Sequence, residues 1–170
     1  MALPGPLHFT QEETGDVFTF PELLEEMGLE DLPEAKLHFS PDLTRKELEV
    51  MIRELSATEP IDQAWTRDLQ KIERDLEGAL DRYHTFAENA PLLFFDRLYQ
   101  YIFYRQLDKE ASYGMDILAR YAQKSTQFIL LQAARTGDLL EAPRRWSEQI
   151  EYDTENVGIL LSLWGNKISH

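Results

Sequence analysis

The stretch FFDRLYQYIFYRQL, residues 94–107, constrains the fold of this chain more than any other segment. Six of its fourteen side chains are aromatic, and only three are charged. A membrane-spanning helix needs about 20 mostly apolar residues, whereas the longest uncharged run here is Leu98 to Tyr104. A helix that is apolar on nearly all sides is usually buried by several neighbours. Residues 91–107 are therefore predicted to form the central helix of a helical domain. The side chains expected in its core are Phe95, Tyr99, Ile102 and Phe103.

Apolar residues recur at three- and four-residue spacing in the rest of the chain after Pro41, as in amphipathic helices. The further predicted helices cover about 48–55, 62–89, 113–135 and 143–164. No segment alternates apolar and polar residues strongly enough to predict a strand. The expected fold class is therefore all-α, a bundle of about five helices with an irregular N-terminal arm.

Residues 1–41 form that arm, because repeated prolines and glycines interrupt every periodic pattern in it. One short helix is expected between Pro21 and Gly28. The domain division is thus an arm over 1–41 and a helical bundle over 42–170. The first sixteen residues lack the basic and apolar regions of a signal peptide, so a cytoplasmic location is expected.

The composition excludes several classes of function. The formal net charge is −14, and no cluster of Lys and Arg offers a surface for nucleic acid or for an anionic membrane. An acidic surface favours a basic protein partner, but its ordinary interpretation is solubility. The chain has no cysteine, which excludes disulfides, thiolate metal sites and a cysteine nucleophile.

Two stripes of acidic residues are candidate sites. Glu77, Asp81, His84 and Glu88 share one predicted helix face. Di-metal bundles, however, place a Glu-x-x-His motif on each of two helices, and this chain has one Asp-x-x-His without a second motif. A solvated face is the favoured interpretation. A second stripe, which is interpreted in the same way, consists of Glu148, Glu151 and Glu155.

Arg105 is the charged residue that most needs an explanation, because it lies within the aromatic helix. A buried guanidinium requires a carboxylate, backbone carbonyls or a ligand. We interpret Arg105 as one half of a structural ion pair, with contact to an anionic ligand as the alternative. No serine nucleophile elbow and no phosphate-binding glycine loop is present.

Three phrases resemble the later part of the flagellin lysine-N-methylase family. They are TEPIDQAW at 58–65, the aromatic stretch at 94–107, and RRWSEQIEYDTENVGILLSLW at 144–164. The family has a phrase of the type E-P-ϕ-x-x-x-W (ϕ apolar), an aromatic helix that ends in arginine, and a closing S-R-E-ϕ-E-H-S-x-E-N-like phrase. The opening LPGPLHFTQEE also looks like the joint that follows the family's cysteine-rich region.

The resemblance implies methyl transfer from S-adenosylmethionine to lysines of flagellin, with an iron–sulfur cluster bound by an N-terminal cysteine cluster. This chain departs from the family at that point, since it has no cysteine, and no catalytic or cofactor-binding residue of the family maps onto it. The expected role is therefore a non-catalytic accessory or substrate-docking portion. Its partner would be a flagellin-like substrate or the protein's own cysteine-rich region.

Two other functions stay open at this point. One is a small acidic all-α chaperone or adaptor that binds an amphipathic partner helix, and the other is an enzyme with S-adenosylmethionine bound between helices. The residues expected to contact a ligand or partner are Arg105, Glu148, Glu151, Asp153 and Glu155. The alternative for the acidic members is an ion pair with Arg120, Arg144 or Arg145 that holds helices together.

Overall fold

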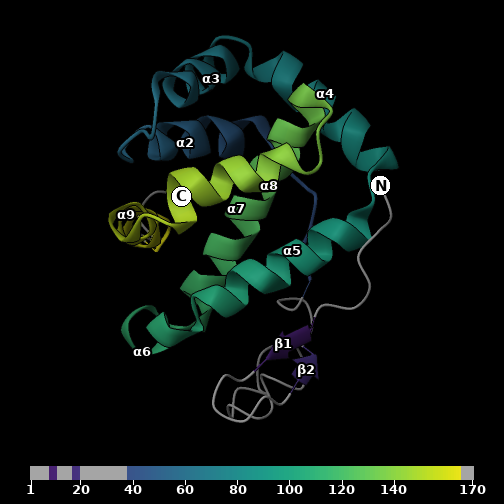
Figure 1. The fold of residues 1–170 in the computed structure, drawn as a ribbon. Helices are drawn as coiled ribbons and strands as arrows, with labels where there is room; N and C mark the ends of the chain where they lie inside the picture. Colours follow the sequence, from purple (N-terminus) through teal and green to yellow (C-terminus); the bar gives the residue numbers. More distant parts are fainter. Residues whose placement is uncertain (1–7, 11–16, 20–37, 166–170) are drawn as a thin grey trace.

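The computed structural model describes residues 8–10, 17–19 and 38–165. Helices account for most of this part of the chain, so the fold class is all-α as predicted (Figure 1). Eight α-helices lie in the described part, more than the five expected. Two of the predicted helices are interrupted by aspartates that begin a new helix, and one further short helix covers Glu110–Tyr113.

A short pair of strands lies in the N-terminal arm. The strands β1 (His8–Thr10) and β2 (Val17–Thr19) are antiparallel, with Phe9 opposite Phe18. The expectation that no segment forms a strand is wrong here. Each strand has only three residues, too few to show an alternating pattern, although both are rich in aromatic and β-branched residues. The short helix expected between Pro21 and Gly28 lies outside the described residues.

The helix α2 (Arg45–Leu55) begins at a capping box. The Glu47 backbone N–H donates to Thr44 Oγ1 at 3.1 Å, and the Thr44 N–H donates to Glu47 Oε1 at 3.0 Å. The buried face of α2 consists of Leu48, Met51, Ile52 and Leu55, the residues whose spacing predicted this helix.

The helix predicted over 62–89 is two helices, α3 (Gln63–Arg74) and α4 (Leu76–Asn89). Asp75 leaves helical geometry with φ −142°, and its carboxylate accepts the Gly78 N–H at 3.1 Å. The carboxylate fits there because Gly78 has no Cβ, which would lie 2.2 Å from an Asp75 oxygen. This side-chain cap ends α3 and begins α4 within one continuous apolar pattern.

The helix at the centre of the bundle is α7 (Met115–Thr136), not the aromatic helix α5 (Leu92–Arg105). It packs against α4, α5, α8, α9 and the short α6 (Glu110–Tyr113), and the ribbon shows it crossed by its neighbours (Figure 1). Its buried residues include small ones, which let several helices approach closely. These small residues are Ala119, Ala122, Ser125, Thr126 and Ala133.

The aromatic helix α5 supplies one wall of the core. The prediction that Phe95, Tyr99, Ile102 and Phe103 are buried is confirmed. The opposite face of α5 is less covered, and the side chains of Leu92, Leu93 and Tyr101 are 40%, 42% and 42% exposed. The helix α5 is therefore buried on one side only, although the stretch that forms it contains six aromatic side chains.

A glycine lies at each end of α7. Gly114 precedes it with φ +84°, and Gly137 follows it with φ +74°, a left-handed conformation that favours glycine. The Gly137 N–H donates to the Ala133 carbonyl at 2.7 Å and so closes the last turn. The short 3₁₀ turn η2 (Leu107–Lys109) joins α5 to α6.

The closing segment consists of α8 (Glu141–Trp146), the π-helical turn η3 (Ser147–Glu151) and α9 (Thr154–Trp164). The predicted helix over 143–164 is thus broken at Asp153, whose carboxylate accepts the N–H groups of Glu155 and Asn156 at 3.0 and 3.2 Å. Within η3 the Tyr152 N–H donates to Ser147 O at 2.9 Å, a bond that reaches five residues back.

The core joins three of these helices through aromatic rings. Phe128 of α7 lies 5.4 Å from Trp65 and 5.8 Å from Trp146, measured between ring centroids, which is the range of favourable aromatic pairs.

Within the described residues, no helix combines the length and the apolar character that crossing a membrane requires.

Candidate functional site

Two of the predicted contact residues, Arg105 and Glu151, are partners of each other. Arg105 Nε lies 3.7 Å from Glu151 Oε2, and the Glu151 side chain is 3% exposed. Gln106 Nε2 donates to the same oxygen at 2.9 Å, and the Tyr121 hydroxyl donates to Oε1 at 3.1 Å. The structure thus supplies the buried carboxylate that Arg105 was expected to need. We call these four residues the Glu151 network.

The burial of Glu151 governs its ionisation. Burial raises the pKa of the Glu151 carboxyl above its ordinary value, although Arg105 and the hydrogen bonds from Tyr121 and Gln106 act in the opposite direction. Several donors therefore contact the charged form, but burial makes this form less favourable than it is in water. A carboxylate in this state belongs to the interior of the protein, not to a surface that meets a partner by charge.

The solvated face predicted for Glu148, Glu151 and Glu155 is wrong for Glu151. In an uninterrupted α-helix these three residues would share a face. The π-helical turn η3 contains an extra residue in its turn, and the break at Asp153 follows immediately, so Glu151 faces α5 and α7. Glu148 remains near the surface in an ion pair with Arg144, and Glu155 is exposed.

Two tyrosines flank the outer side of Arg105. Its guanidinium carbon lies 5.8 Å from the Tyr101 ring centroid and 5.9 Å from that of Tyr152, within the range of cation–π contacts. Arg105 also donates to the Tyr101 hydroxyl at 3.2 Å. Tyr101 and Tyr152 are 42% and 70% exposed, so the three side chains form a surface that we call the tyrosine patch. Asp153 follows Tyr152 directly.

The first and third of the phrases quoted above meet through buried amides. Asn156 Oδ1 accepts the Glu59 N–H at 2.8 Å, and Asn156 Nδ2 donates to the Glu59 carbonyl at 2.9 Å. Gln149 acts in the same way, since its Nε2 donates to the Glu59 carbonyl at 2.7 Å and its Oε1 accepts the Ile61 N–H at 2.6 Å. An ion pair of 3.1 Å between Arg145 and Asp62 lies beside them. These residues therefore join the turn before α3 to the closing segment.

The four residues of the acidic stripe on α4 do not act together, since two make separate structural contacts and two face solvent. Glu77 pairs with Arg45 at 2.6 Å, and His84 Nε2 hydrogen-bonds the Leu43 carbonyl at 3.0 Å. Asp81 and Glu88 are exposed. Within residues 38–165 and the two strands, no three His, Asp or Glu side chains come together as a metal site would require.

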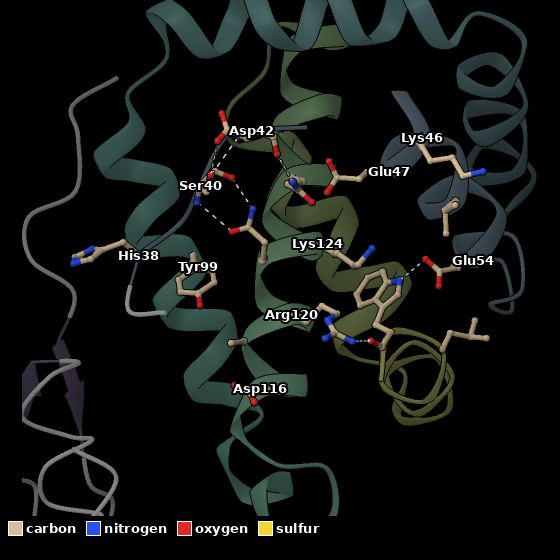
Figure 2. A pocket seen from close by; sticks show the side chains of 16 residues that line it. His38, Ser40, Asp42, Lys46, Glu47, Glu54, Tyr99, Asp116, Arg120 and Lys124 are labelled. Atoms are coloured by element: carbon tan, nitrogen blue, oxygen red, sulfur yellow. Dashed lines mark hydrogen bonds between the residues drawn. The ribbon is translucent and has the colours of Figure 1, made fainter. Parts of the chain in front are cut away.

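A cleft that the sequence did not reveal lies between α2, α5, α7 and α9, with a volume of about 610 Å³ (Figure 2). Residues 38–42 run along one edge of it and are tied to α7, because Gln123 exchanges hydrogen bonds with the Ser40 backbone and Gln127 donates to the Asp42 carbonyl. Its charged lining residues are Asp42, Lys46, Glu47, Glu54, Asp116, Arg120 and Lys124. No motif marks them, since they come from segments far apart in the sequence.

Lys124 and Arg120 project from successive turns of α7 into this cleft (Figure 2). Arg120 Nη1 donates to the Trp164 carbonyl at 2.5 Å, which satisfies the end of α9. The Lys124 ammonium lies 5.9 Å from the Trp164 ring centroid. Burial lowers the pKa of the Lys124 amine, and Arg120 adds to this effect while Glu54 and Glu47 oppose it.

No protein-family model, curated protein or solved structure matches this chain. The candidate sites therefore rest on their own geometry. The Glu151 network is a closed structural arrangement, whereas the tyrosine patch and the cleft present side chains that a partner or a ligand can reach.

Proposed function

We propose that this chain is a non-catalytic docking module that binds a lysine-bearing segment of a partner protein. The observation that carries the proposal is the tyrosine patch, in which two exposed tyrosine rings already hold one cation, Arg105, beside the exposed start of α9. The outer face of Tyr152 offers a second cation the same kind of contact. Asp153 and Glu155 would supply negative charge next to it.

The distribution of charge along the chain supports a basic partner. Residues 38–165 contain 22 acidic and 15 basic residues, whereas residues 1–37 contain nine acidic residues and one basic residue. Complementary charge accelerates the encounter of two proteins more than it tightens their complex. In this proposal the acidic surface attracts the partner, and the tyrosine patch makes the specific contact.

The resemblance to the lysine-N-methylase family names the class of partner. In this proposal the partner is a flagellin-like protein or a cysteine-rich region of a methylase. Methyl transfer itself is assigned to a cysteine-bearing polypeptide that binds S-adenosylmethionine and an iron–sulfur cluster. The present chain contributes docking and no cofactor site of its own.

The test is the binding of flagellin to the chain at low and at high ionic strength. Flagellin should bind at low salt and bind more weakly at 1 M salt, where the Debye length falls to about 3 Å. The double variant Tyr152→Ala with Glu155→Gln should weaken binding about tenfold, since it removes a cation–π contact and a charge. Its free energy of unfolding should change by less than about 0.5 kcal/mol.

A matched control is the double variant Leu140→Ala with Glu88→Gln, which removes an equally exposed apolar residue and an exposed acid from other surfaces. This control should bind flagellin as the unchanged chain does. Equal weakening of both double variants, or no binding of flagellin at low salt, would contradict the docking function.

An adaptor for an amphipathic partner helix is the second candidate, and the exposed leucines of α5 favour it. Leu92 and Leu93 lie side by side on the first turn and are 40% and 42% exposed. An uncharged amphipathic peptide separates the two candidates. Binding of this peptide that Leu93→Asp abolishes and Tyr152→Ala leaves unchanged would favour the adaptor.

A further inference from the structure

Two cationic side chains lie together on the α7 wall of the cleft between α2, α5, α7 and α9, one turn beyond Asp116. Arg120 and Lys124 lie four residues apart on α7, so their side chains emerge from the same face of the helix. Both line the cleft, and each acts on the other as a like charge. Two cations held one turn apart in a partly buried site favour an anion between them.

The hydrogen-bonding partners of the cleft are unequally distributed. Three of its carboxylates already accept a hydrogen bond from the protein. Glu54 accepts from Trp164 Nε1 at 2.9 Å, and Glu47 accepts from the Thr44 N–H at 3.0 Å. Asp42 accepts from the Ser40 hydroxyl at 3.4 Å. By contrast, the Lys124 ammonium has no hydrogen bond or ion pair with any described residue and lies over the Trp164 ring.

The size and the apolar lining of the cleft suit a small organic molecule. A volume of about 610 Å³ lies within the range of ligand sites in proteins. Val50, Ala119, Leu163 and Trp164 contribute apolar surface close to the two cations. An ammonium without an acceptor next to apolar surface is the arrangement that a molecule with one anionic and one apolar end would complete.

We propose that this cleft binds a small organic monocarboxylate. Its carboxylate oxygens accept hydrogen bonds from the Lys124 ammonium and from the guanidinium N–H groups of Arg120 that the Trp164 carbonyl does not use. Its apolar end lies against Trp164 and Leu163. Glu47 and Glu54 limit the charge that the site accepts, because a second negative charge would meet these carboxylates. A monocarboxylate is therefore favoured over a phosphate.

The test is an NMR titration of the ¹⁵N-labelled chain with benzoate, with benzamide as a neutral isostere and inorganic phosphate as a more highly charged anion. Benzoate should shift the resonances of α7 around Lys124 and of the end of α9 in a saturable manner, with a dissociation constant of about 1 mM, as expected for so small a ligand. Benzamide and phosphate should each bind at least about tenfold more weakly.

Variants identify the residue responsible. Lys124→Met, which keeps the length of the side chain but removes its charge, should weaken benzoate binding about tenfold. Lys124→Arg should restore it, which distinguishes a lost contact from a damaged fold. Lys71→Met, a change of an exposed lysine on α3, should have no effect.

Three results would each overturn the proposal. They are the absence of saturable shifts with benzoate, equal binding of benzamide, and benzoate binding that Lys124→Met leaves unchanged. Tighter binding of phosphate than of benzoate would overturn the assignment of a monocarboxylate.

Discussion

The Glu151 network and the cleft around Lys124 present the same physical problem with opposite outcomes. In both, an ionisable side chain lies mostly out of water beside α7, and burial disfavours its charged form. Glu151 receives two hydrogen bonds and an ion pair from three different residues. The Lys124 ammonium lies over the face of the Trp164 ring and has no hydrogen-bond acceptor among the described residues.

This difference separates charges that hold the fold from charges that are available for binding. A buried charge with a full set of partners is expensive to disturb, because its partners are left without it. A half-buried charge without a hydrogen-bond acceptor contributes little to folding and can interact with a ligand. The contrast leads to predictions of opposite kinds for the two regions.

The largest effect is expected for Glu151→Ala. The change leaves the Tyr121 hydroxyl, the Gln106 amide and the Arg105 guanidinium without their shared acceptor. We expect a loss of about 2–4 kcal/mol in the free energy of unfolding. The loss is smaller than for a fully buried ion pair, because Arg105 is partly exposed and can turn to water. Urea denaturation measures it, and Glu155→Ala is the control, with an expected change of less than about 0.5 kcal/mol. Equal small losses for both variants would remove the distinction between an inner and an outer carboxylate.

The second largest loss of stability is expected for Asn156→Ala. This variant tests whether the buried amides hold the closing segment to the turn before α3 as firmly as the Glu151 network holds it to α5 and α7. Asn156 is fully buried, and its side chain makes two hydrogen bonds to the Glu59 backbone and one to the Gln149 carbonyl. Their loss should cost about 2–3 kcal/mol, since the Glu59 N–H and the Gln149 carbonyl both lose a partner on the fully buried Asn156 side chain. Asn156→Asp should restore the acceptor but not the donor and give an intermediate midpoint in urea. A midpoint unchanged by Asn156→Ala would show that the amides do not stabilise this junction.

The order of the helices could be predicted from the sequence, whereas their interruptions could not. Apolar spacing indicated every helical region after Pro41 except the short η2 and α6, because burial of one face determines where a helix forms. Asp75 and Asp153 interrupt two of these regions while the apolar pattern continues. A capping aspartate in such a place resembles any other polar residue on the outer face of a helix.

The candidate site could be predicted only in part for a related reason. Arg105 within an aromatic helix indicated a buried acceptor, but the identity of that acceptor depended on the π-helical turn that rotates Glu151 inward. Lys124 gave no signal, since the cleft that surrounds it is formed by residues from α2, α7 and α9. Local patterns predict which residues need partners, and the packing of distant helices decides which partners they find.

A smaller effect is expected in the pH dependence of stability, measured as the difference in unfolding free energy between the unchanged chain and Glu151→Gln. The folded state raises the pKa of Glu151 above its ordinary value of 4.5, so between these two values the folded state binds more protons than the unfolded state. Stability from this group is therefore fully present below pH 4.5 and is lost as the pH rises through the folded-state pKa.

The unchanged chain should accordingly gain stability relative to Glu151→Gln as the pH falls from 7 toward 4.5. Urea denaturation at several pH values gives this difference, from which carboxylates common to both chains cancel. A difference that decreases as the pH falls would mean that Arg105 and the hydrogen bonds outweigh burial, and that the network favours the ionised carboxylate.

The smallest effect is expected for Lys124→Met, which tests the other half of the comparison. Burial lowers the pKa of the Lys124 amine, so the folded state binds fewer protons than the unfolded state just below the ordinary value of 10.5, and the charged ammonium does not stabilise the fold. Methionine keeps the apolar stem against Trp164 and removes the charge. We expect the free energy of unfolding to change by less than about 1 kcal/mol, and Lys71→Met on the exposed surface of α3 should change it as little. A loss for Lys124→Met as large as that for Glu151→Ala would show that the ammonium is part of the fold, and the two regions would then no longer differ in kind.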